Sequence, residues 1–154
     1  MSDIRTIISD LVAVWNGADL DSLNGIVDEN IRRISSPTTL TNANGLDDLK
    51  RVITEARTMM PDFHVSIEDT VVGEDKSALF WRATGTHTGT TEALPATGRS
   101  FTVDGITFQT YSGGKLIEER VAFDNLHWLV QLGILENPIE AKTEADLTDE
   151  ISVN

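Results

Sequence analysis

The chain has 154 residues, contains no cysteine and carries a formal net charge of −13 at neutral pH. Its length predicts one domain, and the lack of cysteine excludes disulfides and thiolate metal sites and fits a cytoplasmic location. An acidic protein repels phosphate backbones and anionic bilayers, and no run of residues has the pattern of a signal peptide or a membrane span, so we expect neither nucleic acid nor membrane as a partner.

The N-terminal part of the chain predicts three helices and one short strand. Apolar side chains recur at helical spacing over residues 3–16, which is the pattern of an amphipathic helix. A shorter helix is predicted over residues 20–27 and a short strand over residues 31–34. A third helix is expected over residues 46–60, and Pro61 ends it because a residue before proline avoids the helical conformation.

From residue 63 the apolar period changes to two, which is typical of half-buried strands. We expect strands over residues 63–72, 78–88, 101–111 and 116–123. Most of the connections are short, so these strands are expected to pair antiparallel. A final short helix is predicted over residues 126–132.

Helices that precede a run of strands predict the α+β class. We expect a cone-shaped barrel, in which a curved, mostly antiparallel sheet wraps around three N-terminal helices and leaves a pocket at its mouth. Residues 1–136 would form this domain. Residues 137–154 are mostly acidic or small and are expected to be a mobile tail.

Four segments of the sequence carry a resemblance to a known family. They are "AVWNGADLDSL", "GTHTG…LPATGRSF", "YSGGKLIEER" and "FDNLHWLVQLG". Over residues 3–135 the chain resembles the SnoaL-like polyketide cyclases of the nuclear-transport-factor-2-like superfold. The resemblance implies a cone-shaped α+β barrel that forms a homodimer through its open sheet face. It also implies an intramolecular aldol closure of a polyketide ester by acid–base chemistry, without metal or cofactor.

The residues that the family uses for proton transfer are only partly present. The resemblance places an acid–base aspartate directly after Arg120, where this chain has Val121, and a histidine at the position of Thr107. Valine cannot transfer a proton, so the cyclase mechanism is not inherited unchanged. A second family aspartate, at the junction of strand and helix, matches Asp124.

Three residues are therefore the candidate catalytic groups: Glu119, Asp124 and His127. Glu119 shares a strand face with Val121 and would point into the cavity, where a carboxylate can serve as general base. The alternative for Glu119 is a cross-strand ion pair or a charge on a dimer surface. Asp124 would otherwise cap the last helix, and His127 would otherwise lie on the surface of that helix.

Strand parity separates Trp81 from Arg82, and Glu118 or Glu119 is the expected partner of that arginine. His87 lies near a strand end, where a structural or rim role is the alternative to catalysis. The three histidines are widely spaced and form no metal motif. The residues expected to line the pocket are Trp15, Met59, Met60, Trp81, Arg82, His87, Thr107, Tyr111, Val121 and Phe123.

Two functions compete on these observations. The first is a cofactor-free cyclase or isomerase that acts on an apolar small molecule, such as a polyketide-like carbonyl compound. The second is a non-catalytic protein that binds a small molecule in the same pocket. A third possibility, an epoxide hydrolase or dehydratase, requires an Asp–Arg–Asp set inside the cavity, from Arg82 or Arg120 with Asp104 and Asp124.

Overall fold

The computed structural model describes residues 3–36, 41–92 and 94–139. The predicted acidic tail therefore lies mostly outside the described residues. The elements follow one another as α1 (Ile4–Trp15), the 3₁₀ helix η1 (Leu20–Gly25), β1 (Val27–Ser36), β2 (Ala43–Asn44), α2 (Leu46–Met59), β3 (His64–Val72), β4 (Lys76–Thr86), β5 (Ser100–Ser112), β6 (Lys115–Phe123) and α3 (Asn125–Gln131).

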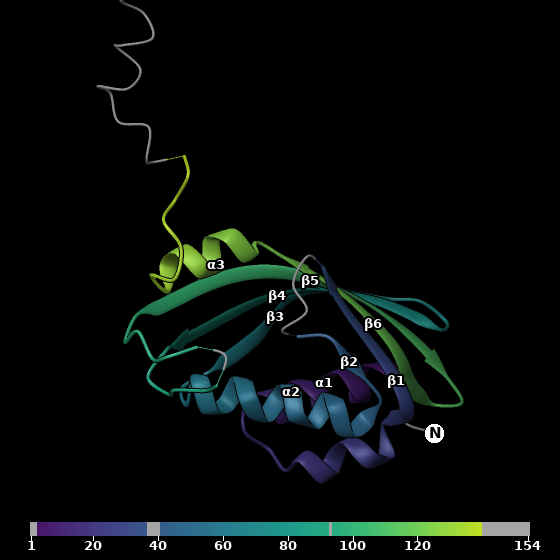
Figure 1. Ribbon diagram of the computed structural model, residues 1–154. Helices are drawn as coiled ribbons and strands as arrows, with labels where there is room; N and C mark the ends of the chain where they lie inside the picture. Colours follow the sequence, from purple (N-terminus) through teal and green to yellow (C-terminus); the bar gives the residue numbers. More distant parts are fainter. Residues whose placement is uncertain (1–2, 37–40, 93, 140–154) are drawn as a thin grey trace, which may run out of the picture.

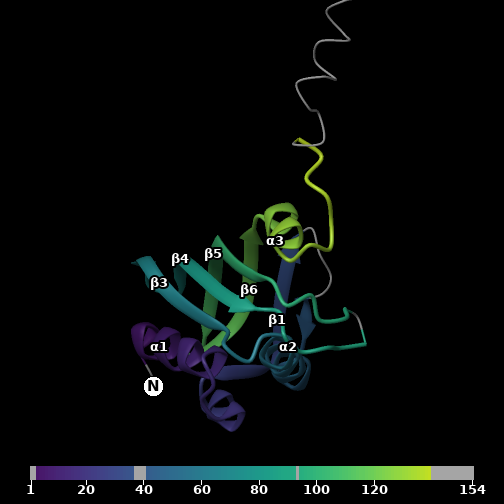
Figure 2. The same cartoon turned by 90° about the vertical axis from the view of Figure 1, so that its left-hand side faces the viewer.

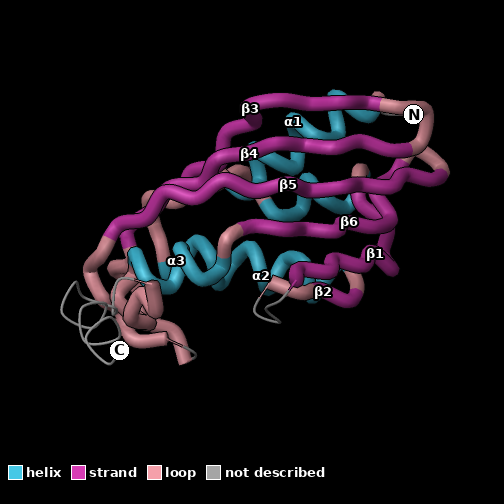
Figure 3. The backbone as a smooth tube through the Cα atoms, turned by 90° about the horizontal axis from the view of Figure 1, so that it is seen from above, coloured by secondary structure: helices cyan, strands magenta, loops and turns pink. Residues whose placement is uncertain are grey.

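The strands form one curved sheet in the order β2-β1-β6-β5-β4-β3, which Figure 3 shows from above. All neighbours pair antiparallel except β1 and β6, which are parallel. The α+β class and the curved sheet are confirmed. The sheet does not close on itself, so the expected barrel is an open one, with β2 and β3 at its two edges.

Strand β1 differs most from the prediction. A short strand was expected over residues 31–34, but β1 extends over Val27–Ser36 and lies between β2 and β6. Its parallel pairing with β6 requires a long crossover, and the whole of α2, β3, β4 and β5 provides it. This pairing brings the N-terminal part of the chain beside the last strand.

Helices α1 and α2 lie under the concave face of the sheet, and α3 packs at one end of the sheet (Figures 1 and 2). Two apolar clusters hold these layers together. One joins α1, η1, β1 and α2 around Leu11, Ile31 and Ile53, and the other joins α3 to the sheet around Phe101 and Trp128. The amphipathic pattern of α1 and α2 thus packs as predicted, with the apolar face toward the sheet.

Polar clamps fix the C-terminal end of α1 against its neighbours. The Asn16 side chain donates to the Val65 carbonyl at 2.9 Å and accepts from the Val65 backbone N–H at 2.8 Å. The Arg57 guanidinium, from α2, donates to the carbonyl oxygens of Val14 and Ala18. These bonds satisfy backbone groups at a helix end and at a sheet edge, and they hold α1 in place beneath the sheet.

One irregularity reverses the alternation of faces within β6. Simple alternation would put Leu116 on the same face as Arg120. The β5–β6 register shifts between Thr110 and Tyr111, so that Tyr111 pairs with Leu116. The extra residue turns Leu116 into the core, where it is fully buried. Within the described ranges, no helix is both long enough and apolar enough to cross a membrane.

Candidate active site

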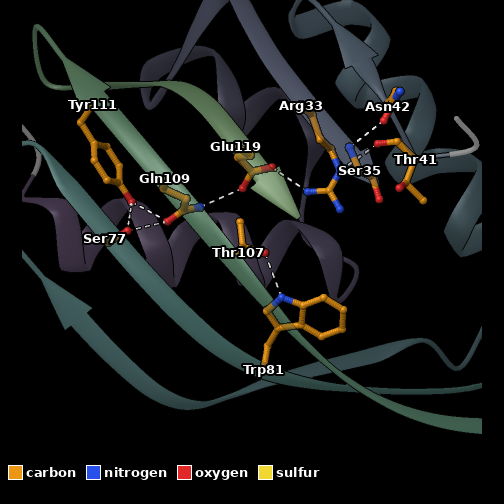
Figure 4. A network of polar contacts seen from close by, with 10 residues as sticks. All are labelled: Arg33, Ser35, Thr41, Asn42, Ser77, Trp81, Thr107, Gln109, Tyr111 and Glu119. Carbon is orange, nitrogen blue, oxygen red and sulfur yellow. Dashed lines mark hydrogen bonds and ion pairs between the residues drawn. The ribbon is translucent and has the colours of Figure 1, made fainter. Parts of the chain in front are cut away.

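A row of polar side chains crosses the concave face of the sheet (Figure 4). Arg33 of β1 is paired in register with Glu119 of β6, Glu119 with Gln109 of β5, and Gln109 with Ser77 of β4. All four residues are buried. Since paired residues on adjacent strands share a face, four strands together build one continuous polar row inside an otherwise apolar layer.

The centre of this row is a buried ion pair. Nη1 of Arg33 lies 2.7 Å from Oε2 of Glu119. The same guanidinium donates from Nε to the Thr41 carbonyl at 2.9 Å and stacks 5.1 Å from the centre of the Trp15 ring. Removing a charge from water is costly unless an opposite charge and hydrogen bonds compensate. Arg33 therefore balances the charge that Glu119 brings into the sheet.

Gln109 engages the other carboxylate oxygen. Its Nε2 donates to Oε1 of Glu119 at 2.8 Å, and its own Oε1 accepts from Ser77 Oγ at 2.9 Å and from Tyr111 Oη at 2.6 Å. The two hydroxyl oxygens are 3.0 Å apart. Burial raises the pKa of the Tyr111 hydroxyl to about 12, and the nearby negative charge of Glu119 adds to the rise. Tyr111 is thus a neutral hydrogen-bond donor.

The polar row forms part of the wall of a cavity between α1 and the sheet. The empty space here is about 480 Å³ and includes open solvent at the mouth of the cavity. Its lining is mostly apolar, with Arg33, Thr107, Gln109 and Glu119 as exceptions that are charged or carry hydrogen-bonding side chains. The full lining is Leu11, Val12, Trp15, Arg33, Phe63, Val65, Ile67, Leu79, Trp81, Ala83, Thr107, Gln109 and Glu119.

Thr107 presents a hydroxyl group to this cavity. Nε1 of Trp81 donates to the Thr107 hydroxyl oxygen at 2.9 Å, so the hydroxyl proton remains free to donate to a ligand. The indole reaches Thr107 by crossing over Gly105, where an added Cβ would lie 2.2 Å from ring atom Cζ2. Glycine at this position therefore allows the Trp81–Thr107 contact.

The two positions to which the resemblance assigns the acid–base pair lie side by side. Thr107 and Val121 are partners in the β5–β6 register, and both are buried. The next inward-facing pair along the same strands is Gln109 with Glu119. The ionisable carboxylate therefore lies two residues, roughly 6.6 Å along the strand, from the position that the resemblance assigns to it.

Two other candidate catalytic residues lie outside this cavity. Oδ1 of Asp124 accepts the backbone N–H of His127 at 2.8 Å, so Asp124 caps α3 as the alternative interpretation had it. Both side chains belong to exposed residues, and neither lines the cavity. Of the three candidate catalytic residues, Glu119 is the one that lines the cavity. It also forms a cross-strand ion pair with Arg33, which was the alternative role considered for it.

Arg82 does not line the cavity as expected but lies on the outer face of the sheet, with a different partner. Arg82 is exposed and binds Asp104 with contacts of 2.8 and 3.1 Å, instead of Glu118 or Glu119. Arg120 pairs with Glu118, also on the outer face. An Asp–Arg–Asp set from these residues and Asp124 therefore does not meet in the cavity, which removes the basis of the epoxide hydrolase interpretation.

Six other residues that were expected to line the cavity are not part of its wall: Met59, Met60, His87, Tyr111, Val121 and Phe123. His87 is fully buried, with Nδ1 3.3 Å from the Thr97 hydroxyl. Met59 and Met60 line a separate groove beside α2. Phe123 stands between the rings of Trp81 and Trp128, with centroid distances of 5.9 and 6.0 Å. Among the described residues, no group of three His, Asp or Glu side chains is arranged to hold a metal ion.

The prediction from sequence missed Arg33, Gln109 and Ser77. Each lies at an inward position of a strand, and the alternation of Thr107, Gln109 and Tyr111 places Gln109 inside. Arg33 likewise shares its strand face with Ile31 and Ser35, which are both buried. A signal was therefore present, since a polar residue at an inward position needs a buried partner.

The curved, open sheet over helices, with a mostly apolar cavity between α1 and the sheet, defines an α+β cone. The chain belongs to the SnoaL-like polyketide cyclase family, whose sequence model matches residues 5–132. No curated protein shows significant sequence similarity to the chain.

Solved structures share this fold. TsrD from Streptomyces laurentii is 22% identical, with a TM-score of 0.76 over 88% of this chain and 100% of that one. IdmH from Streptomyces antibioticus is 24% identical, with a TM-score of 0.71 over 84% and 97%. A protein from Catenulispora acidiphila with a ketosteroid isomerase-like fold is 15% identical, with a TM-score of 0.70 over 84% and 93%. At these identities the likeness shows the fold alone.

The raised pKa of Tyr111 predicts a loss of stability in alkali. A free tyrosine has a pKa of 10.0, and burial raises the pKa of Tyr111 to about 12. Between these values the folded chain holds a proton that the unfolded chain has lost. The free energy of unfolding must then fall as pH rises through this window, by on the order of 2 kcal/mol. Tyr111→Phe should lack this loss. Denaturant unfolding of both proteins from pH 9 to pH 12 measures it, and equal slopes would contradict the assignment.

Proposed function

We propose that this protein is a cofactor-free cyclase or isomerase acting on an apolar, polyketide-like carbonyl compound, with Glu119 as the general base. The observation that carries the proposal is a buried carboxylate, Glu119, on the wall of an apolar cavity that Thr107 supplies with a hydroxyl donor. An acid–base enzyme needs an ionisable group within reach of the ligand space, and Glu119 meets this need although the family's own position holds Val121.

In this mechanism Glu119 removes a proton from a carbon next to a carbonyl group. The negative charge moves onto the carbonyl oxygen, where the Thr107 hydroxyl and the Arg33 guanidinium stabilise the enolate. In a cyclisation, the enolate carbon then forms a bond with a second carbonyl carbon of the same molecule. The alkoxide that results takes the proton back from Glu119, so the enzyme ends in its starting state.

The hydrogen bonds around Glu119 leave room for this role. Each carboxylate oxygen has two lone-pair sites. Oε2 uses one for Arg33 and Oε1 uses one for Gln109, so each oxygen keeps a site for a substrate proton. Arg33 and Gln109 fix the position of the carboxylate, and the mostly apolar lining disfavours water that would compete for the enolate.

Replacement of Glu119 by Gln tests the proposal directly. We expect wild-type protein to accelerate the exchange of the α-protons of 1-tetralone, an apolar fused-ring ketone, in D₂O as followed by NMR. Glu119→Gln should slow this exchange by about 10²-fold or more, because the amide cannot accept the proton. Glu118→Gln is the matched control: it makes the same change on the outer face and should keep the wild-type rate. An unchanged rate in Glu119→Gln would rule out Glu119 as the base.

A second candidate function is a binding protein without catalysis. It is favoured by Thr107 and Val121, the non-titrating residues at the two positions that the resemblance assigns to proton transfer. In that case wild-type protein would bind the ketone, as shown by native mass spectrometry, without accelerating its exchange. The same experiment thus separates the two functions.

We also propose that the protein forms a homodimer through the outer face of the sheet. Four large apolar side chains are exposed there: Val71 (69%), Phe80 (41%), Ile106 (52%) and Phe108 (44%). They lie on neighbouring strands, since Phe80 pairs with Ile106, and Ala78 pairs with both Val71 and Phe108. A contiguous apolar patch of this kind marks an interaction surface.

Charged substitutions in this patch should break the dimer. Sedimentation of wild-type protein should give the mass of two chains, and Ile106→Glu with Phe108→Glu should give one, because a dimer would bury the new charges. Leu126→Glu on α3 changes a residue of similar exposure, 43%, away from the sheet and should remain dimeric. A monomeric wild-type protein would contradict the proposal.

A further inference from the structure

We infer that Ser77, Gln109 and Tyr111 are positioning residues that hold the Glu119 carboxylate in its ionised form by fixing the orientation of the Gln109 amide. The inference rests on the function proposed above, since it concerns the state of the base. It assigns a role to three buried polar side chains that the proton-transfer steps do not use.

The orientation of Gln109 follows from the groups at its two ends. A glutamine side chain has one end that accepts hydrogen bonds and one that donates them. Two hydroxyl donors, Ser77 Oγ and Tyr111 Oη, lie 2.9 and 2.6 Å from its Oε1. Nε2 is therefore turned toward Oε1 of Glu119, 2.8 Å away. In this orientation Gln109 can only donate to the carboxylate.

A protonated Glu119 would fit this arrangement poorly. Both of its protein neighbours, Arg33 and Gln109 Nε2, are donors, so the new O–H would have no acceptor among them. Gln109 could accept only after turning by half a rotation, which would aim its NH₂ group at the two hydroxyl oxygens. The Ser77 proton could then turn to Tyr111, but the Tyr111 proton has no further acceptor in the described part of the chain. A buried donor without a partner is costly, so the network favours the carboxylate.

The hydroxyl donors of the network keep their protons over the whole range of ordinary pH. Apart from Arg33 and Glu119 themselves, the residues that line the cavity from α1, β3, β4 and β5 are neutral. Tyr111 is the one further titratable group that this hydrogen-bond network contains, and burial raises its pKa to about 12. Below that pH its hydroxyl keeps the proton that fixes Gln109.

The test follows the protonation of Glu119 itself. The carboxyl carbon of glutamate is labelled with ¹³C, the Glu119 signal is assigned by its loss in Glu119→Gln, and its midpoint is measured in an NMR pH titration. We expect the midpoint to move upward in Tyr111→Phe and in Ser77→Ala, and by roughly one pH unit, tenfold in proton affinity, in the double variant. Thr110→Val is the control, because it removes a hydroxyl from the outer face of the same strand.

The outcomes distinguish this inference from the proposed function. A midpoint that is unchanged in folded Tyr111→Phe and Ser77→Ala would overturn the inference. Should Tyr111→Phe not fold, Ser77→Ala alone decides the question, because its smaller change keeps the ring of Tyr111 in the core. The titration needs no substrate, so a shifted midpoint supports the inference even if Glu119→Gln leaves proton exchange unchanged and the proposed function falls.

Discussion

The ion pair between Arg33 and Glu119 is the constraint on which the site depends. Neither charge is stable alone in a buried position, because the desolvation of a single ion costs several kcal/mol. The two residues are 86 positions apart in sequence and meet only because β1 lies parallel to β6. The topology of the sheet therefore creates the site: without this crossover, Glu119 would be a charge in an apolar wall with nothing to balance it.

The position of this pair differs from the one that the resemblance predicts. The resemblance assigns proton transfer to the positions of Thr107 and Val121, and here one of them is a hydroxyl donor and the other is apolar. The buried ion pair lies in the next inward row, where Glu119 has Arg33 on one neighbouring strand and Gln109 on the other. A ligand that reacts with Glu119 would have to place its reacting carbon about one strand repeat, roughly 6.6 Å, from the family's position.

The sequence predicted the local features of the molecule well. Apolar spacing of 3.6 and 2 located α1, α2 and the strands from β3 to β6, and the Asp at the end of β6 indicated the start of α3. Parity also put Glu119 on the same strand face as Val121, and the resemblance assigned that face to the cavity. The resemblance supplied the curved sheet over the helices.

Features that depend on distant pairing could not be derived in the same way. Arg33 was missed as the partner of Glu119 because nothing near residue 33 specifies a parallel neighbour. Arg82 was assigned to the wrong carboxylate, since its real partner, Asp104, depends on the register across the β4–β5 connection. The inward position of Leu116 depends on a bulge of one residue, which reverses parity and leaves no mark in the apolar pattern.

The dependence of stability on pH in Arg33→Met is the most direct test of this account. Removing the guanidinium leaves a buried carboxylate without a cation, so the free energy of unfolding should fall by about 3–5 kcal/mol at neutral pH. The carboxylate of the folded variant then binds a proton more readily than that of the unfolded chain, so the deficit relative to wild type should shrink as pH falls. A deficit below about 1 kcal/mol that does not change with pH, as for an exposed ion pair, would contradict the central claim.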